Sequence, residues 1–161
     1  MQNIGLPIII FILLSGCINH DSEQDARMIS PEISGYDSLL ARELGADNYG
    51  MKRYIMAFLM RGDSSLADSA EAARLQRAHL DNITRMAEEG KLILAGPFLD
   101  TTAIRGIYIF NVSTIEAAEK LTLSDPAIKA GVLKMELHPW YGSAALQKLN
   151  ELHARIQEDS I

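Results

Sequence analysis

Cysteine is nearly absent from this 161-residue chain, which contains only Cys17. An intramolecular disulfide needs two cysteines, and zinc sites built on cysteine need several. None of the four histidines forms an HxxxH or HExxH pattern, so a helical zinc site has no support in the sequence. We therefore expect a domain that holds no metal and whose chemistry needs no organic cofactor.

Positive charge and long apolar runs are also scarce. Fifteen Lys and Arg against 21 Asp and Glu give a formal net charge of -6. This charge argues against a nucleic-acid partner, because phosphate binding needs a basic surface. The apolar run at residues 4–14 is shorter than the about 20 residues that a membrane-spanning helix needs. No supersecondary unit repeats, so we expect one folded domain.

The apolar run leads directly into Leu14-Ser15-Gly16-Cys17. A short apolar segment that ends in small residues is typical of a secretory signal peptide. The four residues resemble the lipobox of bacterial lipoproteins, where cleavage precedes a cysteine that carries a diacylglycerol. We expect residues 1–16 to be a signal peptide and Cys17 a lipid anchor outside the cytoplasm. The alternative is a free or buried cysteine behind an uncleaved leader, since Met1-Gln2-Asn3 lacks the usual Lys or Arg.

Composition divides the rest of the chain into three parts. Residues 17–48 are polar and non-periodic, which predicts a flexible tether with one short helix at 36–44. Residues 49–142 carry the hydrophobic periodicity of a folded domain. Residues 143–161 predict an amphipathic helix that docks on protein rather than lipid. Its apolar stripe consists of Leu146, Leu149, Leu152 and Ile156.

The pattern inside the domain alternates strands and helices. Strands are predicted at 54–60, 91–95, 106–112 and 133–138, and helices at 68–89 and 113–121 with a further turn at 125–130. A capping box starting at Ser113 opens the second helix, and Pro139 is expected to stop the last strand. This β-α-β-β-α-β order predicts an α+β, ferredoxin-like fold, a four-stranded antiparallel sheet with helices on one face.

The other face of this predicted sheet has no covering layer from the chain. Its central strands carry apolar residues on both faces, such as Tyr54 with Ile55 and Tyr108 with Ile109. An exposed apolar face usually acquires a partner. We therefore expect a homodimer in which two sheets pack face to face.

His79 and Asp125 are the first candidates for chemistry. His79 lies within the apolar stripe of the first helix, so its imidazole is either a core group with a structural hydrogen bond or a proton-transfer group. Asp125 precedes Pro126, the position of a helix N-cap. Asp125 would take part in catalysis only if its side chain also reaches His79.

Gly96 and Arg105 are candidates for ligand binding. Gly96-Pro97 interrupts a strand, either as a simple end or as a wall where the backbone approaches a ligand. Arg105 at the start of the third strand is either a surface charge or a contact for an anionic substrate. The cluster His138, Trp140 and Tyr141 is interpreted as packing for the C-terminal helix.

Several short motifs follow one another in a specific order. They are His79-Leu80, Gly90-Lys91-Leu92, Ala95-Gly96-Pro97-Phe98, Arg105-Gly106, Asp125-Pro126-Ala127, Ala130-Gly131 and His138-Pro139-Trp140. Their order and spacing resemble the YCII-related (YciI-like) domain family over roughly residues 50–142. The leader, the tether and the C-terminal helix lie outside the family pattern.

The resemblance implies a ferredoxin-like domain that forms dimeric α/β barrels, with a His–Asp active site at His79 and Asp125. Most family activities are unassigned. Some relatives are associated with lyase-type elimination, and related folds include muconolactone isomerase. The resemblance thus favours a small-molecule enzyme that uses His79 as general acid or base. A non-catalytic binding module and a purely structural dimer at the cell envelope are the alternatives.

Overall fold

The computed structural model describes residues 35–159. The predicted signal peptide, Cys17 and most of the predicted tether lie outside this range. Residues Asp37–Ile161 form one compact unit that already includes α1 (Ser38–Glu43), capped by Asp37. No helix among the described residues is long and apolar enough to cross a membrane.

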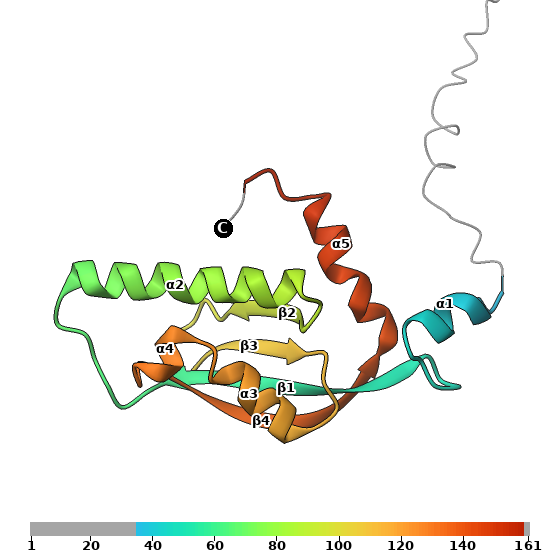
Figure 1. Ribbon diagram of the computed structural model, residues 1–161, viewed down its shortest axis with the longest axis horizontal. Coiled ribbons are helices and arrows are strands. Elements are labelled where there is room, and N and C mark those ends of the chain that lie inside the picture. Colours follow the sequence, from blue (N-terminus) through green and yellow to red (C-terminus); the bar gives the residue numbers. More distant parts are fainter. Residues whose placement is uncertain (1–34, 160–161) are drawn as a thin grey trace, which may run out of the picture. The chain divides into compact units, whose positions relative to one another are not determined.

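Four antiparallel strands form one sheet in the order β2-β3-β1-β4. Their bounds are β1 (Met51–Arg61), β2 (Leu92–Pro97), β3 (Ile104–Phe110) and β4 (Leu133–Ser143). The predicted antiparallel pairing of the two middle strands in sequence, β2 and β3, is confirmed. The mixed α+β architecture is compatible with a ferredoxin-like fold (Figure 1).

Three helices lie over the same face of this sheet: α2 (Ser69–Glu88), α3 (Ile115–Thr122) and α4 (Pro126–Lys129) (Figure 1). Asp68 caps α2, and Gly90 follows the helix with a φ of +66°, which suits glycine. The predicted capping box is one residue out of place. The cap of α3 is Thr114, whose hydroxyl accepts from the Ala117 N–H, rather than Ser113.

The main core lies between these helices and the sheet. Alternate residues of β1, namely Ile55, Ala57 and Leu59, point into it. Their neighbours in the core come from α2, α3 and the other three strands: Ile83, Met86, Leu92, Tyr108, Phe110, Ala118, Leu121, Met135 and Leu137. Burial of this apolar surface fixes α2 over β2 and β3 and thereby positions the candidate site.

The prediction that Pro139 stops the last strand is wrong, because β4 continues to Ser143. Pro139 is paired in register with Ile55 of β1. Since β4 is an edge strand, a proline is tolerated where its missing N–H faces away from the sheet. Whether a proline ends a strand depends on the position of that strand within its sheet, which the local sequence does not reveal.

The C-terminal segment is a short 3₁₀ helix, η2 (Ala144–Lys148), followed by α5 (Leu149–Ala154), instead of one long helix. Leu146 and Leu149 pack with Tyr54, Ile93 and Ile109 on the sheet face opposite α2. The prediction that no part of the chain covers this face is therefore wrong at one end of the sheet. The second half of the predicted stripe does not pack, since Leu152 and Ile156 are exposed.

Candidate functional site

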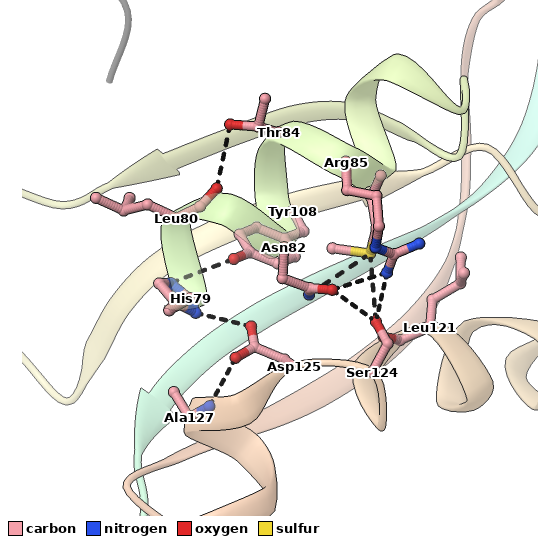
Figure 2. A network of polar contacts seen from close by, with 11 residues as sticks. His79, Leu80, Asn82, Thr84, Arg85, Tyr108, Leu121, Ser124, Asp125 and Ala127 are labelled. Atoms are coloured by element: carbon pink, nitrogen blue, oxygen red, sulfur yellow. Dashed lines mark hydrogen bonds and ion pairs between the residues drawn. The ribbon is translucent and has the colours of Figure 1, made fainter. Parts of the chain in front are cut away.

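His79 and Asp125 are in direct contact, although 46 residues separate them in sequence. His79 Nδ1 lies 2.7 Å from Asp125 Oδ2 (Figure 2). The carboxylate is fully buried and the imidazole nearly so, with side-chain exposures of 0% and 9%. A buried carboxylate requires such a partner, because an uncompensated charge in a low-dielectric interior is costly.

Local sequence and tertiary packing both position Asp125. Its Oδ1 accepts the Ala127 N–H at 2.8 Å and so caps α4, in which Pro126 occupies the first helical position. This leaves Oδ2 for His79. The predicted N-cap role is confirmed, and the same carboxylate also reaches the imidazole.

This geometry fixes the tautomer of the neutral imidazole. An ionised carboxylate only accepts hydrogen bonds, so Nδ1–H donates to Asp125 and Nε2 carries the free lone pair. Nε2 points toward the Tyr108 hydroxyl at 3.4 Å. The arrangement presents a basic nitrogen held by a buried anion, which is the requirement for general acid–base chemistry.

Tyr108 on β3 is a member of the site that the sequence analysis treated only as an apolar residue. Its ring stacks on the His79 imidazole with 6.4 Å between centroids. Burial, together with the negative charge of Asp125, raises the pKa of the Tyr108 hydroxyl well above its ordinary value. The hydroxyl therefore stays protonated and can donate. A tyrosine flanked by Ile107 and Ile109 within a strand is the signal that could have identified it.

A polar network holds α2 against the segment that precedes Asp125 (Figure 2). The buried Asn82 accepts from Ser124 Oγ at 3.0 Å and from Arg85 Nη2 at 2.8 Å. Ser124 is the residue directly before Asp125, so these bonds tie the Asp-Pro turn to the helix that carries His79. This network was not predicted from the sequence.

A cavity of about 280 Å³ lies beside the imidazole. His79 and Tyr108 line it together with the predicted ligand contacts Gly96 and Arg105. Asp125 is not part of the lining and lies behind His79. The structure thus brings all four predicted domain residues to one place, with Asp125 supporting the imidazole from the protein interior.

The other histidine cluster is separate from this site. His138 pairs with Glu136 at 2.9 Å and contacts Phe58, on the sheet face opposite α2. Trp140 packs against the same buried cluster as Leu146 and Leu149 of the C-terminal segment. Within residues 35–159, no three His, Cys, Asp or Glu side chains gather in a way that could hold a metal ion.

Comparison with known proteins now adds the family. The YCII-related domain matches residues 54–141, which is more than half of the chain and spans β1 to β4, including His79, Gly96, Arg105 and Asp125. A search of curated proteins gave no match. From the extent of the domain match, the chain belongs to the YCII-related domain family.

Proposed function

We propose that this protein is a small-molecule enzyme that moves a proton next to an activated carbon, by elimination or isomerisation. The observation that carries the proposal is the buried 2.7 Å contact between His79 Nδ1 and Asp125, in a histidine that also lines a cavity. Structural histidines also form such contacts. Here, however, His79 and Tyr108, whose hydroxyl lies 3.4 Å from Nε2, both line a cavity of about 280 Å³.

Each residue has a role in this reaction. His79 Nε2 accepts a proton from the carbon, and the Asp125 carboxylate stabilises the imidazolium that forms. The Tyr108 hydroxyl, 3.4 Å from Nε2, donates a hydrogen bond to the oxygen on which the electron pair accumulates. His79 then returns the proton to a second carbon in isomerisation or to the leaving group in elimination. No external oxidant or reductant is needed.

Proton exchange tests the proposal whatever the final product is, because it measures the removal of the proton from carbon directly. The protein in D₂O is mixed with a panel of lactones, cyclic ketones and unsaturated acids, and deuterium uptake is followed by NMR. We expect exchange that falls by about 10²–10⁴-fold in His79→Asn, because general-base catalysis is worth that much. Thermal unfolding of the variant verifies that it folds. Equal exchange by His79→Asn and the unaltered protein would refute the proposal.

We also propose that Cys17 is lipidated and holds the domain at the extracytoplasmic side of the cell envelope. The Leu-Ser-Gly-Cys motif at 14–17 supports this location. Growth with an alkyne-tagged fatty acid should label the unaltered protein and leave Cys17→Ser unlabelled. Label on the Cys17→Ser protein would contradict the assignment.

A homodimer through the sheet face opposite α2 completes the proposal. One end of that face is covered by the C-terminal segment. At the other end Phe58, Met60 and Ile107 are only half-buried. We propose that a second copy covers this open half.

A further inference from the structure

The cavity beside His79 adjoins a second cavity of about 400 Å³. The two share Gln76, Arg105 and Leu133 in their linings, and the second extends to Arg61 at the end of β1. Sites for small organic ligands typically occupy about 300–1,000 Å³. Together the two cavities have the size expected for a compact organic molecule.

The walls near His79 are mainly apolar. α2 contributes Leu80 and Ile83, β2 contributes Pro97, and β4 contributes Leu133. Leu75 continues the apolar wall into the second cavity. A ligand that fills this space therefore has a hydrophobic body, since polar groups along it would lose water without gaining partners.

Positive charge gathers at the outer end of the same space. Arg61 and Arg105 both line the second cavity, and neither guanidinium makes a hydrogen bond or ion pair with another of the described residues. Hydrogen bonds from Thr102 are the main cause of the lowered pKa of the Asp100 carboxyl, and the charge of nearby Arg105 lowers it further. In a chain of net charge -6, two arginines beside a cavity that form no ion pair with a described carboxylate favour an anionic ligand.

A β-bulge positions Arg105. Leu59 of β1 is paired with Gly106, whereas the next residue, Met60, is paired with Ile104. Arg105 is thus the extra residue of β3. Bulges redirect a side chain and occur often beside active sites. Here the bulge places Arg105 in the linings of both cavities.

We infer that the substrate is an apolar carboxylic acid, whose carboxylate binds Arg61 and Arg105 and whose body lies along α2 toward His79. Guanidinium groups suit this role because their planar N–H pairs match a carboxylate. This inference rests on the proposed function for the reacting end of the ligand. The carboxylate site itself depends only on the two arginines and the cavity.

Benzoate and its neutral analogue benzamide provide the test. Isothermal titration of the full chain should show benzoate binding at least about tenfold more tightly than benzamide. Arg61→Gln and Arg105→Gln should each weaken benzoate binding by about tenfold or more, as expected for a lost charge-assisted hydrogen bond. Arg53→Gln is the matched control, because it removes the same charge from an exposed position at the other end of β1. It should leave binding unchanged.

The inference is overturned if benzoate does not bind, if benzamide binds equally well, or if Arg53→Gln weakens benzoate as much as the two cavity variants do. The carboxylate site and the proposed enzyme activity can be refuted independently of each other. Benzoate binding that depends on both arginines and persists in His79→Asn supports the carboxylate site even if no proton exchange is found. Proton exchange lost in His79→Asn, with benzoate affinity unaffected in Arg61→Gln and Arg105→Gln, sustains the enzyme and refutes the carboxylate site.

Discussion

At the scale of single residues, one carboxylate combines a structural and a chemical role. Asp125 caps α4 with one oxygen and holds His79 with the other. These roles respond differently to substitution. Asparagine is about as good an N-cap as aspartate, so Asp125→Asn keeps the cap and removes the anion.

We predict that Asp125→Asn changes the tautomer of His79 while the fold is retained. The amide group of asparagine can donate to Nδ1, which would move the imidazole proton to Nε2 and block its function as a base. Long-range ¹⁵N–¹H NMR spectra of the ring distinguish the two tautomers. Stability should fall by about 1.5–3 kcal/mol, the usual contribution of a hydrogen bond to a charged group. An unchanged ring spectrum would mean that Asp125 serves only as a helix cap.

A second prediction concerns Tyr108 at alkaline pH. Its pKa is raised in the folded protein, chiefly by burial, whereas the unfolded chain ionises near the ordinary value of about 10. The unfolded state therefore releases a proton first, and stability should decline as the pH rises above about 10, by up to about 1.4 kcal/mol per pH unit. Urea unfolding between pH 9 and 11 measures this. Tyr108→Phe should have a shallower decline, and the raised pKa values of Tyr54, Tyr141 and Lys148 contribute to the remainder. Identical slopes would refute the assignment.

At the scale of elements, the contact between β2 and β3 forms one wall of the site. A Cβ atom added at Gly106 would lie 2.5 Å from the Gly96 carbonyl oxygen, so the two strands approach closely only because residue 106 has no side chain. Gly96, in contrast, has room for a side chain. A Cβ at Gly96 would meet nothing within 4 Å.

These two glycines give a matched pair of variants. Gly106→Ala should destabilise the fold by about 1–3 kcal/mol, because the methyl group must push the β2 backbone away. Gly96→Ala should be tolerated with little loss. Chemical denaturation of both proteins measures the difference. Equal stability of the two variants would show that the strands are not held as closely as described.

At the scale of the whole molecule, local sequence patterns predicted the helices and strands. The contacts between distant parts of the chain did not follow from these patterns. Alternation and capping residues predicted the strands and the starts of α2 and α4. The continuation of β4 through Pro139 depends on which strands lie at the edges, and Tyr108 meets His79 only after the sheet has formed. The pairing of His79 with Asp125 spans 46 residues and was expected only through the family resemblance.

The proposed dimer makes a prediction at this scale. Phe58 and Ile107 are neighbours on the half of the sheet face that the C-terminal segment leaves open. Ile107→Lys should convert a dimer to a monomer in analytical ultracentrifugation, because burying an unpaired charge in the interface is costly. Leu152→Lys, an exposed leucine on α5, is the control and should stay dimeric. A monomeric unaltered protein would rule out the dimer.

The length of β1 has a consequence for how this domain can be attached to anything else. Its eleven residues extend for about 33 Å, from Met51 beside α1 to Arg61 at the cavity. The chain thus enters β1 at one end of the sheet, and the cavity lined by Arg61 lies at the other. Any carrier joined ahead of α1, whether a fusion partner or a surface, is therefore attached at the end of β1 away from this cavity.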